Sequence, residues 1–284
     1  MPEDSIGSDG LVARRVGPWA KDKFYYLERA CYIFSRGMRL KWPNRCFIDL
    51  FSGPGRGIIT RKGHARRAPD EIDGSPLVAL SSVEPFTHYY FVDLNADYIE
   101  ALSHRVQSMY PHANAQYFPQ DCNKAIPEIL RLLPPASNSL VFAFVDPTGV
   151  QIRMDSVAEL TRGRRMDLLI NYPQNMVVQR LTTLPYTKPH LNAYFGTHEW
   201  ESVLQHARSK GTHEGDALRE FYKMQLQKLG YRSLHFLQDP LIRSDRGTPL
   251  YYLLYASKHD RGVDFWKKIT KRDHTGQEYF ALGE

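Results

Sequence analysis

The sequence predicts an α/β fold: a seven-stranded, mostly parallel sheet with helices on both faces and a terminal antiparallel hairpin. Short apolar runs alternate with helical patterns between residues 45 and 172, as in parallel strands joined by crossover helices. Their nearly continuous apolar character is typical of strands buried on both faces. Two β-rich runs, residues 231–237 and 250–257, flank a loop with Pro and Gly, so we expect them to form the hairpin.

The first elements are a helix and a strand. Residues 1–18 are polar and are expected to form a flexible arm, whereas residues 19–284 are expected to form a single domain. Within residues 19–39, apolar side chains recur at helical spacing, which predicts an amphipathic helix. The run RCFIDLF at residues 45–51 leads into SGPGRG, which predicts a strand followed by a glycine loop.

Two insertions interrupt the regular pattern. Residues 58–73 hold many charges and no hydrophobic period, so they are expected to separate the glycine loop from its helix. That helix is expected to begin with Ser75 as its N-cap and Pro76 at its first position. The second insertion, residues 174–212, is predicted to be mixed and helical.

The other elements alternate along the chain. Strand-like runs occur at residues 89–94, 115–120, 140–145 and 166–172. Helical patterns occur at residues 97–109, 124–133, 154–163, 215–229, which Gly230 closes, and 262–272. A dinucleotide-binding domain would continue in parallel to a sixth strand. Five strand–helix units followed by a reversed hairpin are instead the architecture of Rossmann-like, class I S-adenosylmethionine-dependent methyltransferases.

Composition excludes several classes of protein. Hydrophobic residues make up 42% and charged residues 24%, which suits a folded core and not a disordered chain. No apolar run has the roughly 18 residues of a membrane span, and the polar N-terminus is unlike a signal peptide. Cys31, Cys46 and Cys122 lack the spacing of a zinc site or disulfide framework, which favours a cytoplasmic protein without a metal. The formal net charge of +6 permits an anionic partner such as nucleic acid.

Each of the five strands predicted to be parallel ends in a carboxylate or an amide. Ligands of open α/β sheets bind beyond the carboxyl ends of the strands, so these side chains are expected to meet at one site. The predicted S-adenosylmethionine site comprises Asp49, Phe51, Ser52, Gly53, Pro54, Gly55, Asp93, Leu94, Asp121, Cys122, Asn123 and Asp146.

The glycine loop is the centre of this predicted site. Glycine permits positive φ angles and a close approach of the backbone to a ligand. The loop lacks both the GxGxxG spacing and the GK[ST] ending, so it favours neither a pyrophosphate nor a nucleoside triphosphate. Asp93 is expected to accept hydrogen bonds from the ribose hydroxyls, and Asp121 and Asn123 to bind the adenine amino group. A helix N-cap is the alternative for these residues.

Asp146 and Pro147 are predicted to be catalytic. Amino-methyltransferases carry an Asp/Asn-Pro-Pro-aromatic segment after the fourth strand, whose oxygens hold the target amine in line with the methyl donor. In this chain a Thr-Gly pair replaces the second Pro and the aromatic. Asn171 and Tyr172 follow the fifth strand and form a second candidate segment, in which Tyr172 could stack on a planar base. A loop cap for Asp146 and structural roles for Asn171 and Tyr172 are the alternatives.

A basic loop beside the glycine loop is the predicted contact for nucleic acid. Clustered cations bind phosphates, although a solvated surface loop is the alternative. The residues concerned are Arg56, Arg61, Lys62, Arg66 and Arg67.

Several segments occur together in one order: Lys23-Phe24, FIDLFSGPGRG, Gly74-Ser75-Pro76-Leu77, YYFVDLN, Asp121-Cys122-Asn123, FVDPTGVQI and RRMDLLINYPQNMVVQR. In them the chain resembles the three-Cys-motif partner protein family, a branch of methyltransferase-like proteins. The resemblance covers about residues 21–182 and extends weakly to PLYYLLYASKH. It implies a class I methyltransferase-like fold, S-adenosylmethionine binding and a partner protein with a cysteine motif. The cysteines of this chain are not that motif.

The sequence therefore predicts a methyltransferase that modifies a nitrogen of a nucleic-acid base. One alternative is a non-catalytic S-adenosylmethionine-binding partner or regulator of another enzyme, which the departure from the Asp-Pro-Pro-aromatic pattern favours. The other alternative is a methyltransferase that acts on a small molecule.

Overall fold

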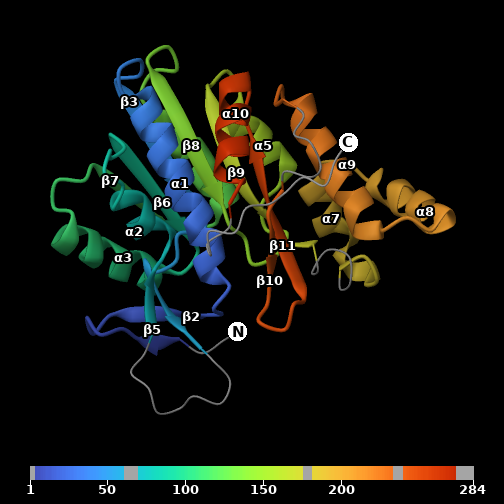
Figure 1. Cartoon of the computed structure of the whole chain (residues 1–284), viewed down its shortest axis with the longest axis horizontal. Coiled ribbons are helices and arrows are strands. Elements are labelled where there is room, and N and C mark those ends of the chain that lie inside the picture. Colours follow the sequence, from blue (N-terminus) through green and yellow to red (C-terminus); the bar gives the residue numbers. More distant parts are fainter. Residues whose placement is uncertain (1–3, 61–69, 175–180, 233–238, 273–284) are drawn as a thin grey trace.

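A seven-stranded sheet forms the centre of the computed structural model, which describes residues 4–60, 70–174, 181–232 and 239–272 (Figure 1). The strand order is β10-β11-β9-β8-β3-β6-β7. The strands are β3 (Asn44–Asp49), β6 (His88–Asp93), β7 (Ala115–Pro119), β8 (Ser139–Val145), β9 (Met166–Tyr172), β10 (Leu241–Arg243) and β11 (Pro249–Ala256).

The connections of this sheet confirm the predicted fold class. Strand β3 lies in the middle, β6 and β7 follow on one side, and the chain then crosses to β8 and β9 on the other side. These five strands are parallel, and β11 lies antiparallel between β9 and β10. This is a Rossmann-like, doubly wound arrangement. Its switch point, where ligands of such sheets bind, lies between β3 and β8.

The hairpin differs from the prediction in its first strand. Residues 231 and 232 are not in a strand, and residues 233–238 lie outside the described residues. The partner of β11 is β10, which occupies part of the segment expected to be a loop. Ile242 of β10 is buried in the core, and this burial stabilises the short strand. The neighbouring Pro and Gly residues had indicated a loop in the sequence.

Two hydrophobic cores lie on opposite faces of the sheet, and β8 contributes to both. Its alternate residues Phe142 and Phe144 belong to one core, and Val141 and Ala143 to the other. This explains the continuous apolar runs, because successive side chains of a strand point to opposite faces. The first core lies under α1 (Ala20–Met38), α2 (Ser75–Leu80), α3 (Ala96–Met109) and α10 (Asp260–Ile269).

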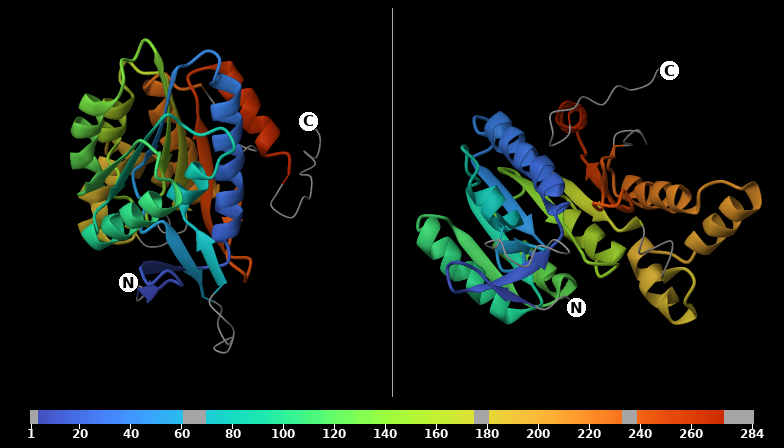
Figure 2. Two further views of the ribbon diagram at one scale, coloured as in Figure 1. Left: turned by 90° about the vertical axis from the view of Figure 1, so that its left-hand side faces the viewer. Right: turned by 60° about the horizontal axis from the view of Figure 1, so that its bottom comes forward.

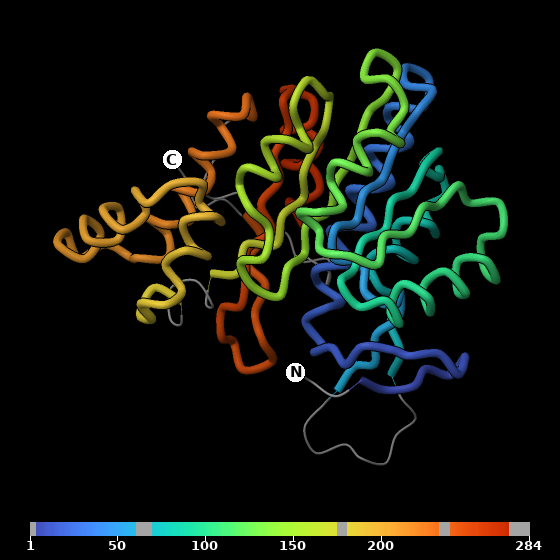
Figure 3. The backbone as a smooth tube through the Cα atoms, turned by 180° about the vertical axis from the view of Figure 1, so that it is seen from behind, coloured from blue at the N-terminus to red at the C-terminus, as the bar shows by residue number. Residues whose placement is uncertain are grey.

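The second core lies under α4 and α5, and a group of helices extends it beyond one side of the sheet (Figures 1 and 3). These elements confirm the helices predicted at residues 124–133 and 154–163 and those predicted in and after the second insertion. They are α4 (Cys122–Leu132), α5 (Met154–Thr161), the 3-10 helix η2 (Pro185–Thr187), α7 (Lys188–Phe195), α8 (Trp200–Lys210) and α9 (Glu214–Lys228). None of the helices within the described ranges is long and apolar enough to cross a membrane.

A second, four-stranded sheet lies across the carboxyl edge of the main sheet (Figure 2). Its order is β1-β2-β4-β5, and its strands are β1 (Ser5–Ile6), β2 (Val12–Val16), β4 (Arg56–Ile59) and β5 (Asp70–Asp73). The expectation of a flexible arm is therefore wrong for these N-terminal strands, since β2 pairs in parallel with β4. The ends of the first insertion are also ordered, because β4 and β5 pair in antiparallel fashion.

The start of α2 differs slightly from the prediction. Gly74 is the N-cap, Ser75 is the first helical residue, and Pro76 lies in the first turn. A Cβ at residue 74 would lie 3.1 Å from the carbonyl carbon of Gly55, so a side chain there would press against the backbone of the glycine loop. Ser75 is thereby left close to the end of β3.

Candidate active site

The glycine loop joins β3 to β4 and is fastened to the end of β6. Gly53 has a φ angle of 59° and Gly55 one of 80°, a left-handed conformation that glycine adopts without strain. The Ser52 amide and hydroxyl donate hydrogen bonds to the Val92 carbonyl oxygen at 2.8 and 3.1 Å. The Gly53 amide donates to Asp93 Oδ2 at 2.9 Å. The predicted loop and the predicted ribose-binding acid are therefore in direct contact.

A pocket opens between this loop, β2, the start of α1 and the end of β8. The predicted site residues that line it are Phe51, Ser52, Gly53, Pro54, Gly55, Arg56 and Asp146. Arg14, Lys23, Phe24 and Ser75 line it too, and none of these was predicted to be a site residue. The N-terminal strand and the first helix thus close one side of the candidate site.

Asp49 lies at the end of β3 and is fully buried. Burial raises the pKa of this carboxyl from 3.8 to about 7, against the smaller opposing effects of the Ser75 hydroxyl and the Phe51 amide. The negative charges of Asp146 and Asp93 also raise this pKa. Its Oδ2 has no hydrogen-bond partner among the described residues.

Asp93 and Leu94 form the second part of the predicted cofactor site. Asp93 is not the N-cap of α3: Asn95 has that role and accepts a hydrogen bond from the Asp97 amide at 2.9 Å. Asp93 instead binds two backbone amides, those of Gly53 and Asn95, each at 2.9 Å. Leu94 is 74% exposed, an apolar side chain left open at this edge.

Asp121 is the N-cap of α4, which was the alternative to adenine binding. Its side chain accepts a hydrogen bond from the Asn123 amide at 3.0 Å. The Asn123 side chain is also engaged within the chain. Its Nδ2 donates to the Gln151 carbonyl oxygen at 2.9 Å, and its Oδ1 accepts from the Arg153 amide at 3.0 Å. Cys122 is buried, and burial raises the pKa of its thiol to about 12. The thiol therefore stays protonated at neutral pH.

Asp146 is held between a lysine and an amide. Its Oδ2 lies 2.5 Å from Lys23 Nζ, and its Oδ1 accepts a hydrogen bond of 2.5 Å from Asn171 Nδ2. Only 13% of the Lys23 side chain and 15% of the Asp146 side chain are exposed. The Lys23 ammonium also lies 4.9 Å from the centre of the Phe24 ring and 5.9 Å from that of Tyr251. Asp146 already binds a cation in this structure.

Asn171 and Tyr172 do not share a role. They are neighbours in β9, so their side chains point to opposite faces, and only Asn171 reaches Asp146. Tyr172 is fully buried against the rings of Tyr194 and Tyr222, with centroid distances of 6.3 and 5.5 Å. The prediction that Tyr172 stacks on a base is wrong, and strand alternation alone could have shown that both residues cannot face the site.

Pro147 follows Asp146 and is buried, so it forms part of the support of Asp146. The next turn is closed by Gln151, which donates to the Thr148 hydroxyl at 2.7 Å and accepts from the Gly149 amide at 2.8 Å. The Thr-Gly pair thus forms a braced loop where the amino-methyltransferase pattern has Pro and an aromatic.

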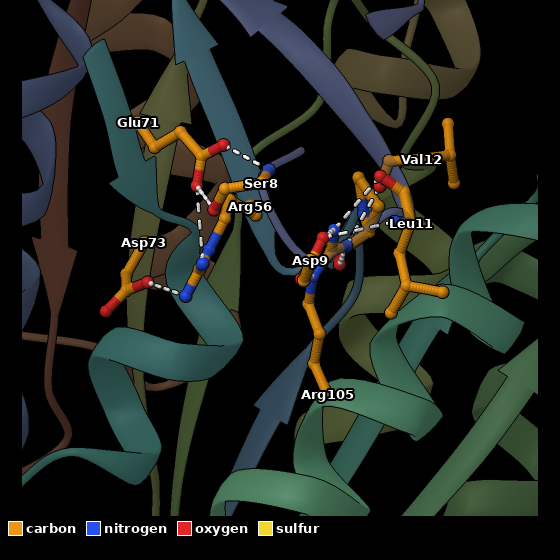
Figure 4. Close-up of polar contacts among 9 residues, drawn as sticks. Ser8, Asp9, Leu11, Val12, Arg56, Glu71, Asp73 and Arg105 are labelled. Atoms are coloured by element: carbon orange, nitrogen blue, oxygen red, sulfur yellow. Dashed lines mark hydrogen bonds and ion pairs between the residues drawn. The ribbon is translucent and has the colours of Figure 1, made fainter. Parts of the chain in front are cut away.

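Arg56 is the described residue of the predicted basic loop, and it is paired within the chain (Figure 4). Its guanidinium lies 3.3 Å from Glu71 and 3.2 Å from Asp73, both on β5. These ion pairs hold β4 to β5. Arg56 also lines the pocket, and its binding of a phosphate stays a prediction. Arg61, Lys62, Arg66 and Arg67 lie outside the described residues.

Arg105 of α3 fastens the N-terminal segment to the glycine loop (Figure 4). It is 2% exposed, forms hydrogen bonds of 2.6 and 2.9 Å with Asp9, and donates to the Val12 carbonyl oxygen at 2.9 Å. It also donates to the Pro54 carbonyl oxygen at 2.5 Å. No sequence signal indicated this residue, because its partners are distant along the chain.

Solved structures with a similar arrangement of the chain share little sequence with it. TYW2 from P. horikoshii in complex with MeSAdo is 11% identical, with a TM-score of 0.42 over 90% of this chain and 71% of that one. Magnesium protoporphyrin IX methyltransferase from Synechocystis PCC 6803 with bound SAH is 11% identical, with a TM-score of 0.41 over 85% and 88%. Protein LPL1258 from Legionella pneumophila is 13% identical, with a TM-score of 0.41 over 62% and 74%.

No protein-family model matches the chain, and no curated protein is significantly similar to it in sequence. The resemblance to the three-Cys-motif partner family therefore stays a prediction.

Proposed function

We propose that this chain is an S-adenosylmethionine-dependent methyltransferase that acts on a nitrogen of a nucleic-acid base. The observation that carries the proposal is the glycine loop at the switch point of the sheet, with two left-handed glycines and a hydrogen bond to Asp93. An open α/β sheet binds its ligand at that place. The lack of a phosphate-binding spacing in the loop favours a cofactor without phosphates.

The donors and acceptors at the site fit this cofactor. Asp49 offers a buried oxygen without a partner among the described residues, which suits the ammonium group of the cofactor. Asp93 accepts hydrogen bonds from two backbone amides, and its oxygens have further lone pairs that can accept hydrogen bonds from ribose hydroxyls. Leu94 offers an apolar surface for a planar base. When bound, S-adenosylmethionine supplies a methyl group on a positively charged sulfur.

Asn171 is the residue we assign to the acceptor nitrogen. Its Nδ2 is fixed by Asp146, and its Oδ1 is buried without a hydrogen-bond partner among the described residues. An unsatisfied buried oxygen is costly, so an N–H donor from a substrate would be favoured there. Asp146 orients Asn171, and Lys23 completes the ion pair. The contribution of the protein is then positioning of the nitrogen lone pair, not proton transfer.

Nucleic acid is the proposed substrate because of the charge around the pocket. The chain carries a formal charge of +6, Arg14 lines the pocket, and Arg15 is exposed on the same strand. The four remaining cations of the predicted basic loop lie between β4 and β5 in the sequence, and these strands lie at the same edge.

The Lys23–Asp146 pair favours a second candidate function, that of a non-catalytic regulator which binds the cofactor. In such a protein the lysine ammonium would permanently fill the place of an acceptor amine.

Transfer of a labelled methyl group to total RNA or DNA distinguishes the two functions. Cofactor binding without transfer would support the regulator, and transfer only to small metabolites would support the small-molecule alternative. Purification with a cysteine-motif protein would support the family resemblance under either function.

Asp93→Ala is expected to weaken the binding of S-adenosylhomocysteine by about ten- to a hundredfold. Hydrogen bonds to a charged acceptor contribute roughly 1.5–3 kcal/mol, and the substitution also frees the Gly53 amide. Isothermal titration calorimetry measures the change. Asp97→Ala, an exposed acid in the first turn of α3, is the matched control and should leave the affinity unchanged. Equal affinities for Asp93→Ala and the wild type would remove the ribose assignment.

The affinity for S-adenosylhomocysteine is expected to rise with pH up to about 7 and then level. Asp49 has a pKa of about 7, so it is largely neutral below that pH, whereas the cofactor ammonium requires its ionised form. Binding below pH 7 should therefore release a proton, which titrations in buffers of different ionisation enthalpy detect. Asp49→Asn should abolish both effects. An affinity that falls as pH rises from acidic values to 7 would contradict this assignment.

Changing Arg61, Lys62, Arg66 and Arg67 together to Gln is expected to weaken nucleic-acid binding and to flatten its salt dependence. A protein that neutralises fewer phosphates releases fewer counterions, so the log–log slope should fall by about 0.7–0.9 for each phosphate no longer neutralised. Filter binding at several salt concentrations provides the slope. An unchanged slope would show that this loop does not touch phosphate.

A further inference from the structure

A second pocket lies at the amino edge of the sheet, at the opposite end of the strands from the candidate active site. It is formed by the end of α1, the beginnings of β8 and β9, and the turn that leads from β11 into α10. Its cavity volume is about 170 Å³. This is below the roughly 300–1,000 Å³ of drug-sized sites, so the pocket suits a small aromatic or aliphatic group.

The walls of this amino-edge pocket are apolar and aromatic. Phe34, Met38 and Trp42 come from α1 and the segment after it, and Phe265 comes from α10. Phe34 packs against Phe142 of the sheet, with ring centroids 5.3 Å apart, so this wall is fixed by the core. Helix α10 approaches closely because residue 262 is glycine: a Cβ there would lie 2.1 Å from Ser257 Oγ.

The charges around the amino-edge pocket are mostly positive. Lys41, Arg165, Lys258 and Arg261 line it, and Asp167 is the acid among the described lining residues. The Arg165 guanidinium lies 5.0 Å from the centre of the Trp42 ring, so an aromatic surface already holds this cation in place. Lys258 is held by a hydrogen bond of 2.8 Å to the Thr161 carbonyl oxygen.

Asp167 limits the charge that the inner end of a ligand can carry. It accepts a hydrogen bond of 2.6 Å from the Tyr255 hydroxyl. Because its carboxylate would repel a second negative charge, the inner part of a ligand must be neutral. The cations Lys41, Arg165 and Arg261 are exposed, so they can meet a negative charge at the outer end.

We propose that the amino-edge pocket binds an amphipathic small molecule with an aromatic or aliphatic body and a single anionic group, such as an aryl carboxylate. The body lies between Trp42, Phe34 and Phe265, and the anion lies beside Arg165 and Lys41. This site is separate from the cofactor pocket and does not depend on methyl transfer.

The test uses a fluorescent anion of this shape, 8-anilinonaphthalene-1-sulfonate, and its uncharged analogue N-phenyl-1-naphthylamine. The wild-type protein should bind the anion more tightly than the analogue. The double variant Lys41→Gln, Arg165→Gln should weaken binding of the anion by about three- to tenfold and leave the analogue unaffected. Arg162→Gln is the matched control, because Arg162 is exposed and close in sequence but does not line the pocket.

A second variant tests the apolar wall. Phe265→Ala should weaken both probes by about tenfold, because it removes a partly buried ring from the pocket. The melting temperature of Phe265→Ala shows whether this variant keeps the fold. If it unfolds, the double variant decides whether the pocket binds the anion, because Lys41 and Arg165 are exposed side chains. Equal affinity for the two probes in the wild type would overturn the proposal. So would equal effects of Arg162→Gln and of the double variant on binding of the anion.

Discussion

Asp146→Ala is expected to lower methyl transfer by about 10²–10³-fold and to change the affinity for S-adenosylhomocysteine much less. The decrease corresponds to roughly 3–4 kcal/mol of transition-state positioning. The physical reason is that Asp146 fixes Asn171 Nδ2 at 2.5 Å and pairs with Lys23, so its removal releases both side chains. Turnover and affinity are measured on one preparation that keeps the wild-type melting temperature.

Two further variants separate the parts of this arrangement. Asp146→Asn keeps the shape and one acceptor oxygen, so partial activity should survive. Lys23→Met keeps the length of the side chain without its charge, and it should raise turnover if the ammonium blocks the acceptor site, or lower it if the ion pair positions Asp146. If Asp146→Ala abolishes binding of S-adenosylhomocysteine, Asp146 belongs to the cofactor site. Unchanged turnover would exclude a catalytic role.

Arg105→Ala is expected to reduce the free energy of unfolding by about 3–5 kcal/mol. Arg105 is 2% exposed and Asp9 28% exposed, so the substitution breaks a largely buried ion pair and leaves the Asp9 carboxylate only partly compensated by solvent. The substitution also leaves the Val12 and Pro54 carbonyl oxygens without this donor. Urea denaturation monitored by circular dichroism gives the change.

The control for this effect is an exposed ion pair. Arg153 and Asp155 form such a pair, with 55% and 63% of their side chains exposed, so Arg153→Ala should leave the free energy of unfolding nearly unchanged. Arg105→Lys keeps the charge but not the forked donor geometry and should fall between the two. Equal decreases for Arg105→Ala and Arg153→Ala would show that Arg105 does not fasten the N-terminal segment.

The strands and most helices could be predicted because their signals are local. The run FVDPTG, for example, places a buried strand and a polar end within a few residues, and β8 with Asp146 lies there. The same holds for Asp49 and Asp93, each at the end of its strand. Strand β10 was missed because its three residues are too few to show a period, and burial of Ile242 provides its stability.

The partners in the site could not be predicted, because they are distant in the sequence. Lys23 and Asp146 are 123 positions apart, and Arg105 and Asp9 are 96 apart. A lysine on the polar side of a predicted helix is normally solvated, and only the crossing of α1 over the end of β8 brings it to a carboxylate. Arg56 belonged to a basic cluster in the sequence, but pairing of β4 with β5 places two acids beside it.

The parallel pairing of β2 with β4 affects how the protein can be shortened or labelled. Removing residues 1–16 would strip β4 of its neighbour and leave its backbone groups open at a sheet edge. An open edge recruits strands from other molecules, so the shortened chain should self-associate. Because β4 continues directly from the glycine loop, such association would also disturb the candidate site. Affinity tags and fluorophores therefore belong away from this end of the protein.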